Sequence, residues 1–260
     1  MTPLRIRILL AIAAPAALAS GASIPEPRMM TWTVDGVKRQ AIVYAPAKVS
    51  NKTPVVLSFH GHGDNMQNFQ SVGLQEAWPE AIVVYPQGLP TSRPGEPALP
   101  GWQTEKGRYG DRDLKLVDQV LADLHAKYAV DDARIYATGF SNGANFTYLL
   151  WAERPNVFAA FAPVAARLAA SVSLRVPKPL LHIAGRNDYT IPFEFQKQAV
   201  EAAERVDGVS SKGESCGSNC MLYNSANGAP VMTVFHAGGH EYPDGTSETI
   251  VKFFKQHPLH

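Results

Sequence analysis

Short runs of apolar residues alternate along this chain with segments whose apolar residues have helical spacing. The segment from Asp113 to Tyr128 is the clearest helix, since its apolar residues recur at every third or fourth position. Apolar runs between such helices suit strands that are buried on both faces of a sheet. We therefore expect a mostly parallel sheet covered by helices on both faces, which is an α/β architecture.

The elements of this architecture can be assigned individually. The expected strands are Val55–His60, Ala81–Tyr85, Arg134–Phe140, Phe158–Ala165, Leu180–Ala184 and Val231–Phe235, and further helices are expected over Asn142–Glu153, Glu194–Val206 and Ser247–Gln256. Near the N-terminus, Asp35-Gly36 separates the extended segments Thr31–Val34 and Arg39–Ala45, which predicts an antiparallel hairpin. The interval from Pro86 to Gly101 contains five prolines and three glycines, so we expect a long, stiff loop there.

The first 22 residues have the features of a cleaved export signal. Arg5 and Arg7 precede an apolar run from Ile8 to Leu18, and small residues that fit an A-x-A cleavage pattern follow. This run of 11 residues is too short to span a bilayer, so we expect no membrane anchor. Residues 23–260 are then a single domain in a protein that is secreted or periplasmic.

The charge balance gives little indication of a macromolecular partner. The formal net charge is +1, and removal of residues 1–22 leaves 22 basic and 23 acidic residues. A nearly neutral chain is not expected to bind nucleic acid through its overall charge. No obligate protein partner is inferred, and the expected ligand is a small or oligomeric substrate.

A serine in a glycine-rich turn is the strongest candidate for chemistry. Gly139-Phe140-Ser141-Asn142-Gly143 matches G-x-S-x-G and lies between an expected strand and an expected helix. That context is typical of a nucleophile elbow, in which a sharp turn raises the serine hydroxyl above the sheet. The alternative interpretation is a glycine-rich turn without chemistry.

A serine hydroxyl needs a base, and the base needs a group that orients it. His240 follows the last expected strand, whereas its nearest competitor, His236, directly follows the final residue of that strand. Asp188 follows the strand Leu180–Ala184, where the carboxylate of a triad is expected. The order Ser141, Asp188, His240 is the order found in α/β-hydrolases.

The oxyanion of an acyl transfer needs two N–H donors. The residue after the nucleophile, Asn142, supplies one, and the loop after the strand Val55–His60 supplies the other. We assign the second donor to the N–H of His62, because the glycines on either side let the backbone approach a substrate oxygen.

The same loop supports a competing hypothesis. His60, His62 and Asp64 form an H-x-H-x-D pattern of residue types that bind zinc in metal-dependent hydrolases. Asn65 stands where that pattern usually carries a histidine, and the hypothesis leaves the serine motif unexplained. Cys216 and Cys220, the only cysteines, are expected to form a local disulfide in an oxidising compartment.

These motifs resemble a known family. His60-Gly61, the stretch Tyr109-Gly110-Asp111-Arg112-Asp113, the serine motif and Gly239-His240-Glu241-Tyr242-Pro243 are similar to those of secreted polyhydroxybutyrate depolymerases, feruloyl esterases and acetylxylan esterases. The resemblance runs from about Val55 to about Pro243. It implies an α/β-hydrolase fold, the triad Ser141, Asp188 and His240, and hydrolysis of carboxylic esters with no metal or organic cofactor.

Two aromatic residues are predicted to reach the substrate. Aromatic faces stack on feruloyl groups and sugar rings, and we expect Trp102 and Tyr242 to provide such faces. Tyr242 stands where many members of the family carry tryptophan, which leaves the preferred acyl group open. A binding protein that retains the fold without catalysis remains a third hypothesis, since fold does not determine function.

Overall fold

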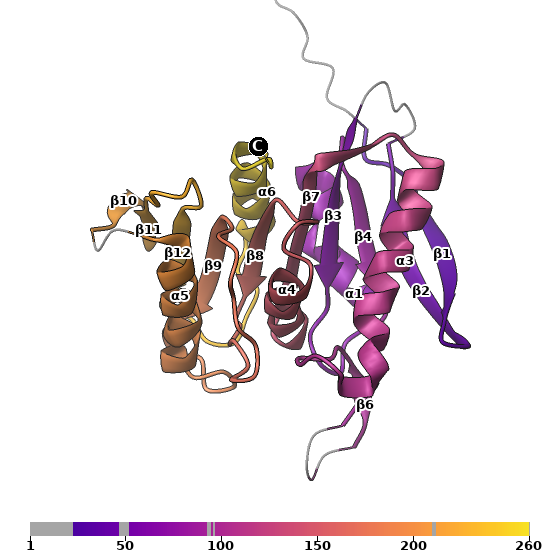
Figure 1. The fold of residues 1–260 in the computed structure, drawn as a ribbon, viewed down its shortest axis with the longest axis horizontal. Helices are drawn as coiled ribbons and strands as arrows, with labels where there is room; N and C mark the ends of the chain where they lie inside the picture. The colour runs from indigo at the N-terminus through magenta and orange to yellow at the C-terminus, as the bar shows by residue number, and fades with distance from the viewer. Residues whose placement is uncertain (1–22, 47–51, 93–94, 96, 210–211, 260) are drawn as a thin grey trace, which may run out of the picture.

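The computed structural model describes residues 23–46, 52–92, 95, 97–209 and 212–259. The predicted export signal, residues 1–22, lies outside these residues. Most strands join one large sheet: β1 (Pro27–Val34), β2 (Val37–Tyr44), β3 (Thr53–Phe59), β4 (Ile82–Pro86), β7 (Val130–Phe140), β8 (Ala160–Val164), β9 (Leu180–Gly185), β10 (Glu214–Gly217), β11 (Cys220–Tyr223) and β12 (Val231–His236). Their order in space is β1-β2-β4-β3-β7-β8-β9-β12-β11-β10 (Figure 1).

The centre of the sheet is parallel and its two ends are antiparallel. The six strands from β4 to β12 in spatial order pair in parallel, while β1, β2, β10 and β11 pair antiparallel to their neighbours. Every residue of β3, β4, β8 and β9 is buried, which agrees with strands covered on both faces. The carboxyl ends of the parallel strands therefore share one edge, where the candidate residues are expected to meet.

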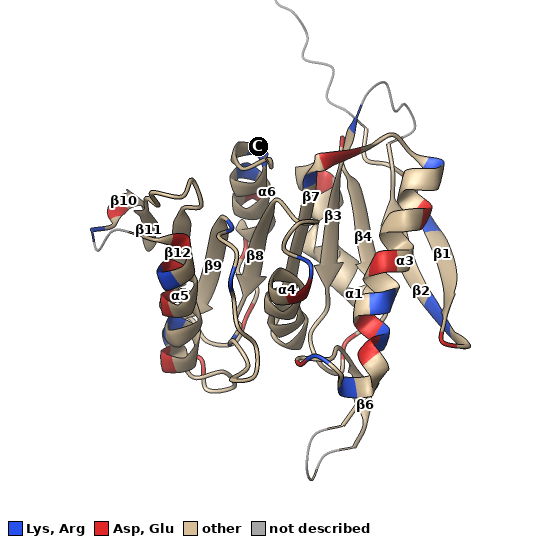
Figure 2. Ribbon diagram, in the orientation of Figure 1, with Lys and Arg blue, Asp and Glu red and all other residues tan. Residues whose placement is uncertain are grey.

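Helices cover both faces of the sheet (Figure 1). They are α1 (Met66–Phe69), α2 (Leu74–Ala77), α3 (Arg112–Lys127), α4 (Asn142–Glu153), α5 (Phe193–Asp207) and α6 (Thr246–Gln256), with short 3-10 helices at η1 (Gln70–Val72) and η2 (Arg108–Asp111). One apolar cluster joins α3, α4 and α5 to the first face, and a second joins α1, α2 and α6 to the other. Lysines, arginines and acids alternate along the outer sides of α3 and α5 (Figure 2).

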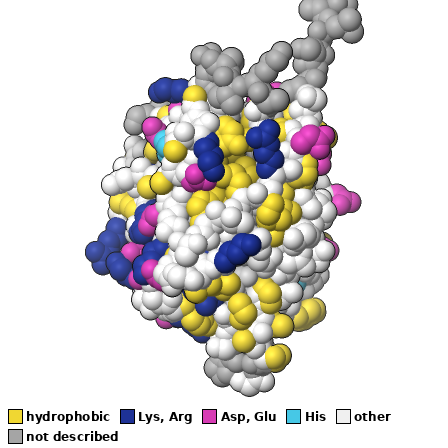
Figure 3. Space-filling view, turned by 90° about the vertical axis from the view of Figure 1, so that its right-hand side faces the viewer, with side chains coloured by type: hydrophobic (Ala, Val, Ile, Leu, Met, Phe, Trp, Pro, Cys, Tyr) yellow, Lys and Arg dark blue, Asp and Glu magenta, His cyan; other side chains and the backbone are white. Residues whose placement is uncertain are grey.

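The predicted α/β architecture is confirmed, and the expected strands and helices are present within a few residues of their predicted ends. The predicted hairpin is β1–β2, and its turn residues Asp35 and Gly36 both have positive φ. Such a turn matches the twist of paired strands. The edge of the sheet at β1 exposes apolar side chains interspersed with basic ones (Figure 3).

Two parts of the chain differ from expectation. The interval 86–101 is not a loop throughout, because β5 (Leu89–Thr91) and β6 (Leu99–Gly101) pair as a small antiparallel ribbon. The two strands approach closely at Gly88, where an added Cβ would lie 2.6 Å from the carbonyl oxygen of Gly101. The strands β10 and β11 were not predicted, since their short sequences lack a clear apolar pattern.

Cys216 and Cys220 form the predicted disulfide, with their Cα atoms 5.1 Å apart. The bridge closes the turn between β10 and β11, where Asn219 has a positive φ. A bond of this kind is typical of proteins from oxidising compartments. Among the described residues, no helix is both long and apolar enough to cross a membrane.

Candidate active site

Ser141 lies at a strained turn between β7 and α4. Its φ and ψ are 54° and −117°, a conformation that costs a residue with a side chain about 1–3 kcal/mol. The flanking glycines make this turn possible. A Cβ at Gly139 would lie 2.7 Å from the carbonyl oxygen of Phe59, and one at Gly143 only 2.1 Å from it. The serine motif is thus built as the elbow that the sequence predicted.

The three predicted triad side chains meet above the edge of the sheet. Nε2 of His240 lies 2.9 Å from Oγ of Ser141, and Nδ1 of His240 lies 2.8 Å from Oδ2 of Asp188. This geometry fits a histidine that donates through Nδ1 to the carboxylate and accepts the serine proton at Nε2. The serine and the acid are 99 and 52 residues away from His240 in the sequence, and only the fold brings them together.

Asp188 is buried and fully bonded. Its Oδ1 accepts the N–H groups of Thr190 and Ile191, both at 2.8 Å. Its Oδ2 accepts the amide of Gln196 at 3.0 Å in addition to the imidazole of His240. These donors hold the carboxylate in one orientation toward the imidazole of His240.

The loop that carries His240 is attached to the loop that carries Asp188. Asn187 donates its backbone N–H to Gly238 and its side-chain amide to Ala237, at 3.0 and 2.7 Å. A Cβ at Gly185 would lie 2.2 Å from the carbonyl oxygen of Gly239, so only glycine permits this approach. His236, the competing histidine, instead accepts the N–H of Gly238 through Nδ1 at 3.1 Å.

The two amides predicted to stabilise an oxyanion lie beside the serine. His62 and Asn142 line the same cavity as Ser141, and neither backbone N–H donates to another residue of the described chain. Asn142 begins α4, whose first N–H groups have no partner within the helix. Within the described residues, both N–H groups therefore lack an acceptor.

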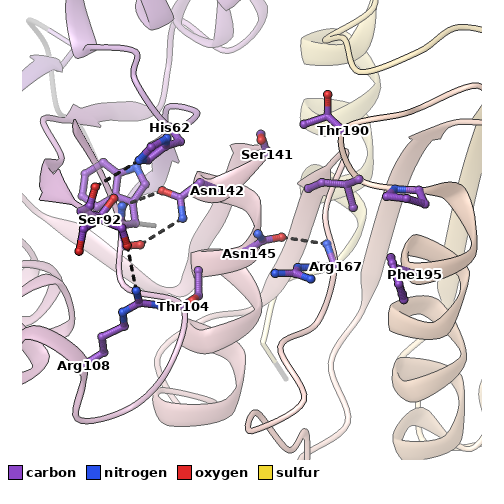
Figure 4. A pocket seen from close by; sticks show the side chains of 14 residues that line it. His62, Ser92, Thr104, Arg108, Ser141, Asn142, Asn145, Arg167, Thr190 and Phe195 are labelled. Atoms are coloured by element: carbon purple, nitrogen blue, oxygen red, sulfur yellow. Dashed lines mark hydrogen bonds between the residues drawn. The ribbon is translucent and has the colours of Figure 1, made fainter. Parts of the chain in front are cut away.

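The cavity above Ser141 has a volume of about 540 Å³ (Figure 4). One wall comes from the ribbon β5–β6 and the segment that follows it, and the other from the start of α5. The lining residues are His62, Thr91, Ser92, Trp102, Thr104, Arg108, Ser141, Asn142, Asn145, Arg167, Thr190, Ile191, Pro192 and Phe195. This is the size range of small-molecule sites.

Trp102, which was predicted to present a face to the substrate, lines this cavity as a nearly fully buried wall. Its side chain is 1% exposed and stacks on Phe146 at 5.7 Å between ring centroids. Its indole N–H donates to the carbonyl of His60 at 2.9 Å. The side-chain amide of Asn142 bonds both its N–H and its carbonyl group, at 2.7 and 3.1 Å. The tryptophan thereby connects the end of the strand before His62 to the first residue of α4.

A buried ion pair beneath this wall was missed by the sequence analysis. Nη2 of Arg39 lies 2.8 Å from Oδ1 of Asp113, and both side chains are fully buried. Oδ2 of Asp113 accepts the N–H of Gln103 at 2.8 Å, directly after Trp102. In the sequence Arg39 is one polar residue of an edge hairpin, and no local pattern links it to a partner 74 residues away.

Gln196 was also missed. It lies on the buried side of α5 with Ala199, Val200 and Ala203, and it is the amide that reaches Asp188. A polar residue at the position where helical spacing predicts an apolar one was the signal that could have found it.

Tyr242 does not lie where it was predicted. It is not among the described residues that line the cavity, and its ring packs edge-on against Phe69 and Phe140. Its hydroxyl is bonded to Ser247 at 3.0 Å, and burial raises the pKa of this phenol. The ring centroid of Phe140 also lies 4.8 Å from that of His240. Tyr242 therefore packs against a residue that contacts the His240 ring.

The residues of the metal hypothesis do not converge. Nδ1 of His60 lies 2.7 Å from the carbonyl oxygen of Gly61, and its Nε2 accepts the N–H of Gly88 at 2.9 Å. Burial lowers the pKa of His60, which agrees with a neutral ring whose two nitrogens are already used. Asp64 instead accepts the side-chain amide of Asn68. Among the described residues, no group of three or more His, Cys, Asp or Glu side chains is arranged to hold a metal.

Comparisons with known proteins identify the relatives of this chain. No family model matches the sequence. A bifunctional acetylxylan esterase/xylanase of Neocallimastix patriciarum is 30% identical over 164 residues, which are 61% of this chain and 23% of that protein. Poly(3-hydroxyalkanoate) depolymerase C of Paucimonas lemoignei is 24% identical over 240 residues, covering 77% and 57% of the two chains. This chain thus spans less than two thirds of either relative.

A third relative and a solved structure complete the comparison. A probable feruloyl esterase C of Aspergillus niger is 27% identical over 209 residues, 74% of this chain and 72% of that protein. The structure of the acetyl xylan esterase from Aspergillus awamori matches with a TM-score of 0.66 at 15% identity, covering 88% of this chain and 99% of the other. The chain is therefore a relative of acetylxylan esterases, feruloyl esterases and polyhydroxyalkanoate depolymerases, and it has the α/β-hydrolase fold.

Proposed function

We propose that this chain is an exported serine esterase that hydrolyses carboxylic esters through an acyl-enzyme. Ser141 is the nucleophile, His240 the general base and acid, and Asp188 the carboxylate that orients His240. The observation that carries the proposal is the continuous contact from Oγ of Ser141 through the imidazole to Oδ2 of Asp188, at 2.9 and 2.8 Å. The esterase and depolymerase activities for which the relatives are named are of the same chemical kind.

The reaction takes place in two steps. His240 removes the proton of Ser141 as Oγ attacks the ester carbonyl, and the N–H groups of His62 and Asn142 stabilise the oxyanion. The C–O bond to the alcohol then breaks, and His240 gives its proton to the leaving oxygen. Water repeats the sequence on the acyl-enzyme, which releases the acid and restores the serine. Each oxyanion donor contributes about 3–4 kcal/mol to the transition state.

The substrates are esters of the kinds named for the relatives: feruloyl and acetyl esters of plant polysaccharide, or hydroxyalkanoate esters. The partly aromatic wall at Trp102 suits each of these. A panel of acetyl, feruloyl and hydroxybutyrate esters assayed on the mature protein ranks them by kcat/KM.

Ser141→Ala tests the nucleophile. We expect kcat to fall at least about 10⁴-fold with unchanged thermal unfolding, because the hydroxyl contributes to catalysis and not to the core. Ser173→Ala, at an exposed serine outside the cavity, is the matched control and keeps full activity. A fluorophosphonate probe should label wild-type protein at Ser141 and leave the Ser141→Ala variant unlabelled.

The outcomes separate the three hypotheses. Turnover by Ser141→Ala at the wild-type rate contradicts the assignment of the nucleophile. Activity that disappears with a chelator and is restored by zinc supports the hypothesis of His60, His62 and Asp64. A folded wild-type protein that neither turns over an ester nor reacts with the probe favours the binding-protein hypothesis.

Export is a separate part of the proposal. The predicted signal at residues 1–22 and the disulfide between Cys216 and Cys220 support it. We expect protein collected from the periplasm or the medium to begin at residue 20 or 23, as N-terminal sequencing would show. Recovery only in the cytoplasm with residues 1–22 intact would contradict export.

A further inference from the structure

The loop after β8 presents an arginine beside the nucleophile. Ala165 has a φ of 52°, unusual for a residue with a side chain, and donates its N–H to Ile183 at 2.9 Å. Two residues later, the N–H of Arg167 donates to Oδ1 of Asn145 at 2.8 Å, in the first turn of α4. These bonds fix the backbone of Arg167 next to the helix that begins after Ser141.

The guanidinium of Arg167 lines the cavity and is uncompensated. In the described chain it forms no ion pair and no hydrogen bond, and its side chain is exposed. In Figure 4 it lies between Asn145 and Phe195, below Ser141. Glu105 lines the adjacent hollow together with Arg167, but its carboxylate is not within ion-pair distance.

The charged residues that line the cavity are all positive. Its described lining contains Arg108 and Arg167 but no aspartate or glutamate. Arg108 is already engaged, because its Nη2 donates to the carbonyl of Ser92 at 3.1 Å and its guanidinium lies 5.2 Å from the centroid of the Tyr109 ring. Arg167 is thus the cation whose donors remain available, and its planar fork matches the two oxygens of a carboxylate.

We infer that this cavity favours esters carrying a carboxylate, with Arg167 as the residue that binds it. The inference rests on the proposed esterase function and specifies its substrate class. The carboxylate belongs to the acyl part, as in a half-ester of a dicarboxylic acid, or to the alcohol part. Both placements present the same group to Arg167, and matched substrates distinguish them.

The test uses isosteric pairs and two arginine variants. For the acyl side, 4-nitrophenyl hemiglutarate is compared with the ester in which a carboxamide replaces its free carboxylate. For the alcohol side, 4-acetoxybenzoate is compared with 4-acetoxybenzamide. Each pair is assayed with wild type, Arg167→Gln and Arg175→Gln. Arg175 is an exposed arginine outside the cavity, so its variant changes the net charge equally.

At low ionic strength we expect Arg167→Gln to lower kcat/KM about fivefold for the carboxylate-bearing ester of at least one pair. This is the size of effect expected for an exposed ion pair. For the matched carboxamide it changes little, and Arg175→Gln leaves both values unchanged. Comparing the same two substrates across variants cancels their intrinsic reactivity. Added salt reduces the preference, because the Debye length falls.

Two outcomes overturn the inference. One is an unchanged carboxylate-to-carboxamide ratio in Arg167→Gln for both pairs, and the other is an equal loss in Arg175→Gln. In either case a wild type that hydrolyses the carboxamide esters and loses this activity in Ser141→Ala still supports the proposed function. Absence of turnover and of probe labelling in the wild type would instead contradict the function itself.

Discussion

Two buried acids on the same face of the sheet are accommodated in different ways. Asp113, in the first turn of α3, has Arg39 on one oxygen and the N–H of Gln103 on the other, at 2.8 Å each. Asp207, in the last turn of α5, receives only the N–H of Lys178 at 2.9 Å, and its second oxygen has no partner in the described chain. Both side chains are inaccessible to solvent.

The helix positions increase this difference. A carboxylate is stabilised at the start of a helix and destabilised at its end, because the helix dipole is positive at the N-terminus. Burial raises the pKa of Asp207 from 3.8 to about 8, only partly opposed by the Lys178 N–H. Burial alone therefore does not determine whether an acid is charged, and the supply of donors does. Asp113, which has a donor on each oxygen, lies beneath the cavity wall at Trp102, where a fixed orientation is needed.

The largest expected effect comes from removing the partner of Asp113. Arg39→Met leaves a buried carboxylate without its cation, and we expect the free energy of unfolding to fall by about 3–5 kcal/mol in urea denaturation. Arg154→Met is the matched control, since Arg154 pairs with Asp118 at 2.7 Å with side chains 28% and 46% exposed. An exposed pair contributes about 1 kcal/mol or less. Equal losses in the two variants would contradict the contrast between buried and exposed pairs.

The next prediction concerns the pH dependence that Asp207 produces. Its folded pKa of about 8 lies above its unfolded value of 3.8, so the folded state binds a proton more tightly. The stability that this tighter proton binding contributes is complete below about pH 4, and it is lost as the pH rises through about 8. Asp207→Asn resembles the protonated acid. The wild type should therefore lose stability relative to this variant by up to about 1.4 kcal/mol per pH unit within that window.

Urea unfolding at several pH values measures this difference. Subtracting the curve of the variant removes the contribution of Lys178, whose pKa is lowered by burial, since Lys178 is present in both proteins. Asp244→Asn, at an exposed acid, should give a curve parallel to that of the wild type. A constant difference between wild type and Asp207→Asn across this range would show that Asp207 is charged in the folded state.

The contrast between these acids also shows what sequence reasoning reaches. The strands, the helices and the elbow at Ser141 were predictable because their signals are local: periodicity, and glycines at fixed spacing. The sites of Asp188 and His240 were predictable because strand ends in a parallel sheet share one edge. In each case a rule about neighbouring residues or about topology determined the answer.

Other features depend on contacts that no local rule describes. The burial of Arg39 becomes apparent only when β2 lies beside the start of α3, and the ribbon β10–β11 is too short and too polar for its pattern to be recognised. Tyr242 was misplaced for the same reason. Proximity to His240 in sequence suggested the cavity, whereas the loop turns its ring toward Phe69 and Phe140. Side-chain direction within loops is set by tertiary packing.

A third buried acid sharpens the comparison with the smallest effect. Asp188, 4% exposed, is held by the N–H groups of Thr190 and Ile191 and by Gln196. Gln196→Met removes one donor from the oxygen that faces His240 and preserves the length of the side chain. A hydrogen bond to a charged group contributes about 1.5–3 kcal/mol. If part of this free energy acts through the orientation of His240, its loss lowers kcat on the order of tenfold.

The split between kcat and KM distinguishes positioning from a general loss of structure. KM should remain near the wild-type value, because Gln196 does not line the cavity. Gln198→Met, the same substitution on the exposed side of α5, is the matched control and should leave kcat and KM unchanged. An unchanged kcat in a folded Gln196→Met protein would mean that the two backbone donors on Oδ1 suffice to orient Asp188. The amide would then serve stability alone.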